Sequence, residues 1–497
     1  MSIPVSIPVS ITALDVAEEF IRRHRDTVRY EHTSGGWLVF HSHLGWRRDD
    51  HQVEVHQLVI NLLKNLASFV PPNVSTLEAR RFTKTRQSSV RKLMNQGSIG
   101  SILTLASRNR SLLVNAEHID ARRDILVAPN GVIDLRTGAC RAHERQHVAL
   151  RRTETDYDPT TRCPRFERFL DEVLGTDADI RAYRQTWLGY LATGETRQHQ
   201  MWLLMGAGAN GKSTLLHVLQ RVLGTYAQQA AESVVLAGAA TGTATPELTR
   251  LRDVRLAVLS ETGHGQNLNE SRVKSLVSGD TVTARPLYGN FVQFQPVAKF
   301  LLATNTLPVV HGTDHGIWRR IVVVPFGATF DLDADPALAD DLAAESEGIL
   351  NWLVRGAVAY YANGLPPVPA AWSVATQSYR NASDPVGAFL AKSCVMKAGV
   401  SVGATELYDA YRRDARENDF DVLSQGEFGQ RMKTVPSVTK GRHGKANLHY
   451  YFGLRLVETE SAGSTSQTLL DIDDRVSTVS PRLRASHRSP RTVLAGK

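Results

Sequence analysis

The feature that most constrains the fold is a glycine-rich segment that begins at Gly206 and ends at Lys212 and Ser213, matching GxxxxGK[ST] in full. The apolar run Met201–Met205 before it predicts a buried strand, and residues 214–223 after it predict a helix. A strand, a tight loop and a helix in this order are typical of α/β proteins with a parallel sheet. We therefore predict an α/β core around this segment.

This loop has the chemistry of a phosphate-binding site. Glycines let the backbone curl so that its N–H groups point toward phosphate oxygens, and the start of the following helix adds a favourable dipole. On this interpretation Lys212 contacts the β- and γ-phosphates of ATP, and Ser213 ligates Mg²⁺. The alternative is a glycine-rich turn that matches the pattern by chance. The predicted nucleotide-contacting residues are Gly206, Ala207, Gly208, Ala209, Asn210, Gly211, Lys212, Ser213 and Thr214.

A second apolar run, residues 255–260, ends in the acid Glu261. If this run is a core strand beside the first, Glu261 lies near the γ-phosphate, where it can polarise the attacking water and help to hold Mg²⁺. Ser260 stands where an Asp usually precedes this Glu, so metal binding would rest on Ser213, Glu261 and water. The alternative is an ordinary surface Glu at the end of a strand.

A third apolar run, Lys299–Thr304, is followed by Asn305, whose amide can hydrogen-bond the γ-phosphate or the attacking water. Arg319 and Arg320 come directly before a further apolar run. Two adjacent arginines suit an arginine finger, which stabilises transition-state charge on a neighbouring subunit's nucleotide, and we favour Arg320 slightly. The alternative is a pair of surface arginines beside a strand.

Between the second and third runs, two alternating stretches on either side of residues 286–290 predict a hairpin. Lys274 precedes it, and Arg285 and Tyr288 near its turn offer charge and a stacking ring, which an element that tracks a DNA strand needs. The alternative, a structural hairpin whose Arg285 pairs with Asp280, is favoured by composition alone.

The last part of the chain predicts a separate domain. Residues 405–416 and 424–433 have the pattern of two amphipathic helices, and residues 438–454 that of a hairpin. Two helices and a basic wing outline a winged helix-turn-helix, whose wing could contact DNA phosphates. The alternative is a small helical domain with a solvated loop. The basic residues predicted at the tip of the wing are Lys440, Arg442 and Lys445.

Composition and turn signals also suggest the domain organisation. Asn130-Gly131 between apolar stretches predicts a hairpin, and residues 74–113, rich in Arg, Lys, Ser and Thr, predict partly solvated helix. We predict a flexible leader at 1–12, a mixed α+β N-terminal domain at 13–165, the α/β core with its leading helices at 166–330, a helical segment at 331–365, the winged helix at 370–457 and a disordered basic tail at 461–497.

The bulk composition, 42% hydrophobic and 22% charged, is that of a soluble globular protein. The net charge of +8 permits a polyanionic partner without demanding one. The three cysteines form no CxxC pair and no metal-ligand spacing, which fits a reducing cytoplasm. No run approaches the roughly 20 apolar residues of a membrane helix, and the first residues lack the basic region of a signal peptide. We therefore expect a cytoplasmic protein without a membrane partner.

The glycine loop, Glu261, Asn305 and the arginine pair, in this order, resemble the superfamily-three helicases, and more narrowly the poxvirus-type and phage/plasmid primase-helicase family. The resemblance covers roughly residues 120–455. It implies a RecA/AAA-like P-loop ATPase core that hydrolyses ATP with Mg²⁺ to move on single-stranded or forked DNA. It also implies a homo-hexameric ring and a bacterial host cell. The segments that extend the resemblance are residues 130–135, 157–159, 188–190 and 348–352.

By this resemblance Lys212 and Ser213 are the loop ligands, Glu261 is the water-activating acid, Asn305 is the sensor and Arg320 or Arg319 is the finger. Family members often carry a primase domain upstream. Here only about 120 residues precede the recognisable region, and no DxD follows the acidic pair Asp49-Asp50 there, so we expect a motor that works with a separate primase. Two other classes stay open: an origin-binding or replication-initiation protein that uses ATP to assemble, and a metabolic P-loop kinase.

Overall fold

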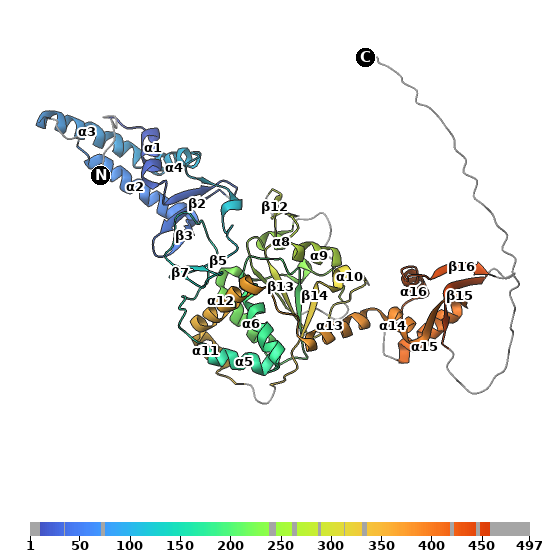
Figure 1. Ribbon diagram of the computed structural model, residues 1–497. Helices are drawn as coiled ribbons and strands as arrows, with labels where there is room; N and C mark the ends of the chain where they lie inside the picture. The colour runs from blue at the N-terminus through green and yellow to red at the C-terminus, as the bar shows by residue number, and fades with distance from the viewer. Residues whose placement is uncertain are drawn as a thin grey trace, which may run out of the picture. The chain divides into compact units, whose positions relative to one another are not determined.

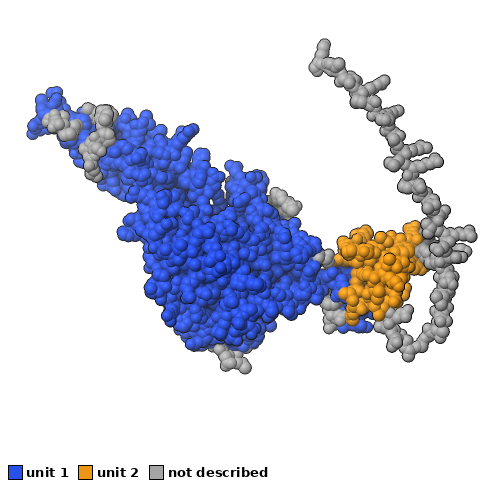
Figure 2. All heavy atoms as spheres, viewed as in Figure 1, with its two compact units in different colours: residues 1–389, 411–424 blue, residues 390–410, 425–497 orange. Residues whose placement is uncertain are grey.

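The computed structural model describes most of the chain in two compact units, residues 1–389 with 411–424, and residues 390–410 with 425–497 (Figure 2). Among the residues described, no helix has both the length and the apolar character needed to cross a membrane. The predicted tail and most of the predicted leader lie outside the described residues. These are 10–33, 35–70, 75–237, 245–260, 266–286, 290–312, 314–330, 335–417, 422–443 and 448–457.

The N-terminal part combines helices with a small sheet of strand order β3-β2-β1-β4 (Figure 1). Its core gathers around Trp37, which packs edge-on against Phe20 and Tyr30. Ile11 is buried in this core and Thr12 caps the first helix, so the predicted flexible leader extends too far at its end. The elements are α1 (Ala13–His24), β1 (Val28–Glu31), β2 (Gly36–His41), β3 (Gly45–Arg48), α2 (Val53–Ser68), α3 (Thr76–Leu93), α4 (Gln96–Ser107) and β4 (Leu113–Val114), with 3₁₀ turns at Asp50–Gln52 and Ala116–His118.

A second small sheet, β5-β6-β7, confirms the predicted hairpin at Asn130-Gly131. Its strands are β5 (Ile125–Ala128), β6 (Gly131–Asp134) and β7 (Cys140–Arg141). A Cβ at Gly131 would lie 2.5 Å from the carbonyl oxygen of Arg141, so only glycine fits where the third strand passes. The Asn130 amide also bonds the backbone N–H and carbonyl of Tyr157 at 3.0 Å, which fixes the turn to the joint that leads into the core.

The centre of the first unit is a five-stranded sheet of order β14-β8-β13-β10-β9. Each neighbouring pair in it is parallel. Three of the apolar runs singled out in the sequence form β8, β10 and β13, and the run after Arg320 forms β14, so the predicted α/β class is confirmed. The bounds are β8 (Met201–Met205), β9 (Ala227–Gln229), β10 (Leu256–Ser260), β13 (Lys299–Thr304) and β14 (Ile321–Pro325).

Helices cover both faces of this sheet, as parallel strands require. Alternate residues of a strand enter different cores: Trp202 and Leu204 pack with the helices of one layer, and Met201 and Leu203 with those of the other. The first layer contains α5 (Pro164–Leu174), α6 (Ala178–Ala192), α7 (Lys212–Leu223), α11 (Leu338–Ala344) and α12 (Ser346–Asn363). The second contains α9 (Glu270–Ser278) and α10 (His315–Trp318), with short elements at Gly224–Tyr226, Glu232–Val234 and α8 (Pro246–Arg250) elsewhere in the core.

A hairpin leaves the core between β10 and β13, as predicted. It pairs β11 (Val282–Ala284) with β12 (Val292–Phe294) in antiparallel register. Helix α13 (Ala370–Ser383) packs along the edge strand β14, where the Val323 N–H donates to the Thr376 hydroxyl at 2.9 Å. The predicted C-terminal domain began at residue 370, whereas α13 belongs to the first unit because Trp372 is fully buried in its core.

The second unit holds a three-stranded antiparallel sheet of order β15-β17-β16. Its strands are β15 (Cys394–Gly403), β16 (Thr439–His443) and β17 (Leu448–Leu456), and Phe428 of α16 (Gln425–Met432) packs against Tyr451 of the sheet. The helices α14 (Pro385–Ser393) and α15 (Ala404–Glu417) each span a boundary between the units. The two predicted helices and the hairpin are present, and β15 is an additional strand that the sequence did not reveal.

The closest helix crossing in the core predicts a strict need for glycine. A Cβ at Gly189 of α6 would lie against the backbone of Gly356 and Ala357 in α12, whereas a Cβ at Gly100 of α4 would meet nothing within 4 Å. We expect Gly189→Ala to lower the free energy of unfolding by about 1–3 kcal/mol, because the helices must move apart. The matched control, Gly100→Ala, should raise it by roughly 0.5–1 kcal/mol, since alanine restricts the unfolded chain. Equal melting temperatures of the two variants would contradict this packing.

Candidate active site

A pocket of about 320 Å³ opens at the carboxyl-end edge of the central sheet. Three parallel strands end here: the glycine loop follows β8, Ser260 ends β10, and Thr304 ends β13. Because parallel strands bring their carboxyl ends to one edge, segments about 100 residues apart in the chain meet. The lining residues are Gly208, Ala209, Asn210, Gly211, Lys212, Ser213, Thr214, Ser260, Ala303, Thr304 and Asn305.

The loop between β8 and α7 depends on its glycines. Gly208 has φ +129° and Gly211 has φ +83°, backbone conformations that other residues rarely adopt. A Cβ at Gly211 would also lie 2.5 Å from the side chain of Val173 in α5. Ala209 has φ +41° despite its side chain, a strained conformation of the kind that concentrates at functional sites. The loop leads directly into α7, whose first backbone N–H groups have no acceptor within the helix.

Lys212 is the buried cation of the pocket, with 7% of its surface exposed. Its ammonium donates to the Gly206 carbonyl at 2.6 Å, to the Asn305 amide oxygen at 3.0 Å and to the Asn210 amide oxygen at 3.1 Å. Burial lowers the pKa of Lys212 from its ordinary value. A lysine has three N–H donors, so each already has an acceptor, all three neutral oxygens. The contact joins the predicted loop lysine to the predicted sensor Asn305.

Two further polar groups face the same edge. The Nδ2 group of Asn210 is buried and has no hydrogen-bond acceptor among the described residues. The Ser260 hydroxyl accepts from Gln229 Nε2 at 3.1 Å. Gln229 ends β9, a strand that was not predicted because it has only three residues. Glu261, predicted as the acid and as a metal ligand, follows Ser260 directly but lies outside the described residues.

The oxygen ligands that the described lining could offer a cation include the hydroxyls of Ser213, Thr214 and Ser260. Ser213 is exposed at the second position of α7. Within the described ranges, no three His, Cys, Asp or Glu side chains come together as a metal cluster. A hydroxyl, water and phosphate oxygens are the set that Mg²⁺ accepts beside a nucleotide, so the chemistry of Ser213 fits the predicted ion.

The arginine pair lies at the other edge of the sheet. Arg320 precedes β14, and its carbonyl accepts from the N–H of Met201, the first residue of β8. Because β14 has five residues at about 3.3 Å each, roughly 16 Å of strand separates the arginines from the edge that carries Lys212. The Arg320 guanidinium donates to the Gly316 carbonyl at 2.7 Å and to the Ser278 hydroxyl at 2.9 Å, and burial lowers its pKa. Arg319 is exposed.

The predicted DNA-contacting residues of the core lie on and beside the β11–β12 hairpin. Lys274 of α9 forms an ion pair with Asp314 at 2.9 Å. The Arg285 guanidinium lies over the Phe291 ring, 5.5 Å from its centre, and Phe291 is 70% exposed. Tyr288 lies outside the described residues. The hairpin therefore presents a cation and an exposed ring, although the ring is Phe291 and not one that the sequence singled out.

The predicted wing residues are placed differently from the prediction. Lys440 and Arg442 lie within β16 and not at a hairpin tip, because β16 pairs with β17 as far as His443 and Leu448. Both side chains are exposed, and Lys440 lies over the Tyr451 ring at 5.6 Å. As alternate residues of one strand, they share a face. Lys445 lies outside the described residues.

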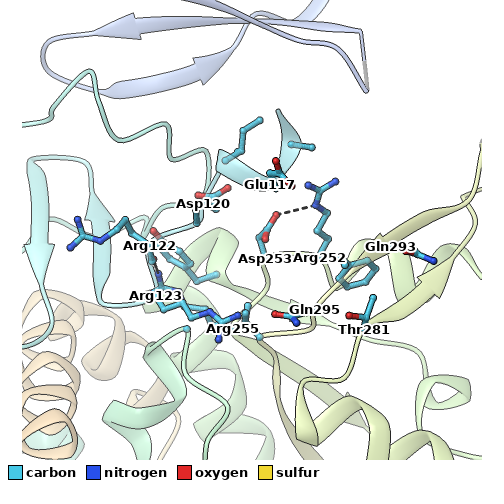
Figure 3. Close-up of a pocket in the computed structure, with 17 residues that line it drawn as sticks. Glu117, Asp120, Arg122, Arg123, Arg252, Asp253, Arg255, Thr281, Gln293 and Gln295 are labelled. Carbon is cyan, nitrogen blue, oxygen red and sulfur yellow. Dashed lines mark hydrogen bonds and ion pairs between the residues drawn. The ribbon is translucent and has the colours of Figure 1, made fainter. Parts of the chain in front are cut away.

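A second pocket, of about 390 Å³, lies at the amino-end edge of the sheet (Figure 3). Asp120 and Asp253 face each other across it, and Arg252 forms an ion pair with Asp253 at 3.4 Å. Burial raises the pKa of Asp253 to about 6, and the charge of Asp120 contributes to the same shift. Burial also raises the pKa of Asp120, although its carboxylate accepts from the N–H groups of Leu150 and Arg151.

Two family models match the chain. A model described as "D5 N terminal like" matches residues 17–175, and a model described as a family of unknown function (DUF5906) matches residues 204–320. The first match covers the N-terminal sheets and reaches into α5. The second begins at the end of β8 and covers the glycine loop, α7, the hairpin and the arginine pair. The N-terminal match begins about 100 residues before the point where the motifs alone suggested a resemblance.

Relatives occur among large DNA viruses. A protein of Acanthamoeba polyphaga mimivirus, provisionally named a helicase, is 27% identical over 329 residues, 61% of this chain and 34% of that protein. A protein of African swine fever virus, provisionally named a primase, is 25% identical over 252 residues, 49% of this chain and 26% of that protein. The chain thus spans about a third or less of these relatives. Among solved structures, the apo C terminal region of NrS-1 aligns with a TM-score of 0.49 at 11% identity, covering 89% of this chain and 99% of that one.

The carboxyl pair of the second pocket predicts a pH dependence of stability. The Asp253 pKa is raised above its unfolded value near 3.9, so stability is lost as pH rises from about 4 to about 6. We expect Asp253→Asn to raise the free energy of unfolding at pH 7 by about 1–2 kcal/mol and to change little below pH 4.

The control for this prediction has the opposite sign. The pKa of Asp124 is lowered to about 2, chiefly by its hydrogen bond with Arg122. Asp124→Asn should therefore destabilise the protein at pH 7 and lose its effect as pH falls toward 2. Melting temperatures between pH 3 and pH 8 measure both variants, and parallel curves for Asp253→Asn and wild type would contradict the raised pKa.

Proposed function

Because the chain belongs to the viral- and phage-type primase-helicase family, we propose that it is an ATP-dependent replicative DNA helicase, which hydrolyses ATP to move on and unwind DNA. The observation that carries this proposal is the buried Lys212 ammonium, which lies between a glycine loop and the end of the neighbouring strand. A fixed cation, a helix amino end and a shallow pocket at the carboxyl ends of parallel strands are what a triphosphate requires.

In this proposal the loop is a P-loop in a RecA/AAA-like core. The N–H groups of the loop and of α7 bind the β- and γ-phosphates, Lys212 neutralises them, and Ser213 ligates Mg²⁺. Bound Mg²⁺ would act as a Lewis acid on the oxygens of the γ-phosphate. Asn305 holds the γ-phosphate or the attacking water, and Glu261 accepts the proton of that water. The buried, unsatisfied amide of Asn210 would help to fix the loop once phosphate oxygens are near.

The proposed assembly is a ring, most simply a homo-hexamer, in which each site is completed by a neighbour. The support is the distance of roughly 16 Å between the arginine pair and the Lys212 edge of the same sheet, which prevents either arginine from reaching its own pocket. Arg319 is exposed, while Arg320 is held by Gly316 and Ser278. We therefore extend the finger proposal to both residues with equal weight.

DNA contacts are proposed at two places. In the core, the hairpin offers Arg285 and the exposed Phe291 ring for charge and stacking. In the second unit, Lys440 and Arg442 would contact phosphates as part of a winged helix. Priming activity is not part of the proposal, and a separate primase would act with the motor. The competing possibility is an initiation protein that binds an origin and uses ATP to assemble.

The deciding experiment measures ATP hydrolysis with and without single-stranded DNA, together with unwinding of a forked duplex. We expect DNA-stimulated hydrolysis and strand separation by the wild type. Lys212→Ala should lose hydrolysis by about 10²-fold or more, because the transferred phosphoryl loses its fixed counter-charge. The control, Lys64→Ala on the exposed side of α2, should keep wild-type turnover. Near-wild-type turnover by Lys212→Ala would rule out the proposed site, and stimulation without unwinding would favour the initiation protein.

The shared site predicts complementation between two inactive variants. Lys212→Ala subunits keep the arginine pair, and Arg319→Ala or Arg320→Ala subunits keep the loop. Loss of the finger should slow hydrolysis by roughly 10³–10⁵-fold and leave nucleotide binding intact. Mixing a finger variant with Lys212→Ala should restore activity above that of either alone, and the arginine that complements is the finger. Light scattering must first establish that the variants assemble. No complementation by either arginine, or full activity of a dilute monomer, contradicts the ring.

A further inference from the structure

Helix α3 carries an unusual excess of positive charge that neither the core nor the second unit accounts for. Its 18 residues include six basic side chains and a single acid, Glu78. One of the six, Arg86, is buried between the rings of Phe69 and Phe82. The other five are exposed, and we call them the cationic face of α3: Arg80, Arg81, Lys84, Arg91 and Lys92.

The five exposed cations lie on one side of the helix. At 3.6 residues per turn, they fall within an arc of about 120°, and Val90 and Arg86 mark the opposite, buried side. α3 packs against α2 and α4 (Figure 1), and the five cations on its other side are exposed. From Arg80 to Arg91 the face is about 16 Å long, at roughly 1.5 Å per residue. The cations thus form a band on one side of the helix in two groups, one of Arg80, Arg81 and Lys84 and one, about two turns further on, of Arg91 and Lys92.

No carboxylate among the residues that the structure describes neutralises this band. Within the described part of the chain, no ion pair joins any of the five cations to a carboxylate. The one acid of the helix, Glu78, is held by the N–H and hydroxyl of Ser75 in a capping box at the helix start. The positive charge therefore stays available to a partner.

Helix stability does not explain the band either. Arg91 and Lys92 lie in the last turn, where cations favour the helix dipole. Arg80 and Lys84, however, are like charges four residues apart, a pairing that destabilises a helix by a few tenths of a kcal/mol. Arg80 and Arg81 also lie in the amino half, where the dipole gives a cation no advantage. A membrane surface is a poor fit, because Val90 and Leu93 of α3 are packed into the N-terminal core and Leu77 is the one large apolar side chain of the helix that stays exposed.

We propose that the cationic face of α3 binds the phosphodiester backbone of nucleic acid, independently of its sequence. A backbone carries one charge per nucleotide along a line, which matches a band of cations better than a compact acidic ligand does. This inference rests on the proposed function for the DNA substrate, but it assigns the N-terminal helices a contact separate from the hairpin and from β16. The motor would hold DNA through a surface that takes no part in hydrolysis.

The test uses the full-length chain with three charges removed. Arg80→Gln, Lys84→Gln and Arg91→Gln are combined, because glutamine keeps helix propensity and loses only the charge. The matched control removes three exposed arginines from other helices, Arg168→Gln, Arg221→Gln and Arg355→Gln. A second variant, Arg80→Lys with Lys84→Arg and Arg91→Lys, keeps the charge. Fluorescence anisotropy with single-stranded, duplex and forked DNA gives Kd as a function of salt, and DNA-free ATP hydrolysis is measured in parallel.

We expect DNA binding by the triple variant to depend less strongly on salt than binding by the wild type. For duplex DNA, each phosphate contact contributes about 0.9 to the slope of log K against log salt, so the triple variant should lose roughly 2–3 of slope and bind on the order of 10- to 10³-fold more weakly at 0.1 M salt. The charge-preserving variant and the control should bind as the wild type does, with DNA-free hydrolysis unchanged in all. The arm that weakens most identifies the DNA form that α3 contacts.

Two results would overturn the inference. One is a triple variant that binds every DNA form with the slope of the control, which removes α3 from the DNA path and leaves the helicase proposal intact. The other is a triple variant that keeps DNA binding but loses binding to phosphatidylserine vesicles or to an acidic peptide, which assigns the face to a different partner. Conversely, a slope that falls as expected in a protein without DNA-stimulated hydrolysis would support the α3 contact and contradict the helicase proposal.

Discussion

The parallel alignment of β8 with β13 on one side and β14 on the other is the constraint on which the site depends. Met205 pairs with Thr304 and with Pro325, so three strands end at the same level. The loop that leaves β8 must turn at that edge, and its positive φ angles at Gly208 and Gly211 direct the chain into α7. Lys212 then meets Asn305 without either residue being close in sequence. The pocket forms at this edge because the parallel strands end there, whatever side chains line it.

The same alignment separates two groups of charge. The glycine loop and Lys212 lie at the carboxyl-end edge, and Arg319 and Arg320 lie at the amino-end edge together with the pocket around Asp120 and Asp253. No rotation of an arginine side chain crosses a five-residue strand. In the proposed function, a single copy would therefore bind a nucleotide without bringing these arginines to it, and the proposed ring would complete the site. The N-terminal part supplies Glu117 and Asp120 to the second pocket, whereas Asp253 belongs to the core.

Short-range rules predicted most of the core and failed where long-range packing decides. The strand–loop–helix unit, the Asn130-Gly131 turn and the β11–β12 hairpin follow from alternation and glycine chemistry. Strand β9 has too few residues to show a pattern, and β15 has a register shift between Met396 and Ser401 that breaks its alternation. The apolar spacing of α13 predicts which face of the helix is buried but not which domain it packs against. The prediction therefore placed α13 in the C-terminal domain, whereas it belongs to the first unit. Whether a guanidinium is enclosed, as that of Arg320 is, depends on neighbours some 40 residues away.

The hydrogen bonds of Lys212 suggest how a phosphate bound in the pocket would change the contact with Asn305 at the end of β13. Its three donors contact neutral oxygens, so an anionic phosphate oxygen would add an attraction between opposite charges that none of these acceptors supplies. Binding a phosphate would thus replace at least one of these acceptors at a net gain. Asn305 follows β13, whereas Gly206 and Asn210 belong to the loop. If Lys212 lost its bond to Asn305, it would no longer link the end of β13 to the loop. Since β13 follows the hairpin in the chain, a change at Asn305 lies one strand away from the residues proposed to contact DNA.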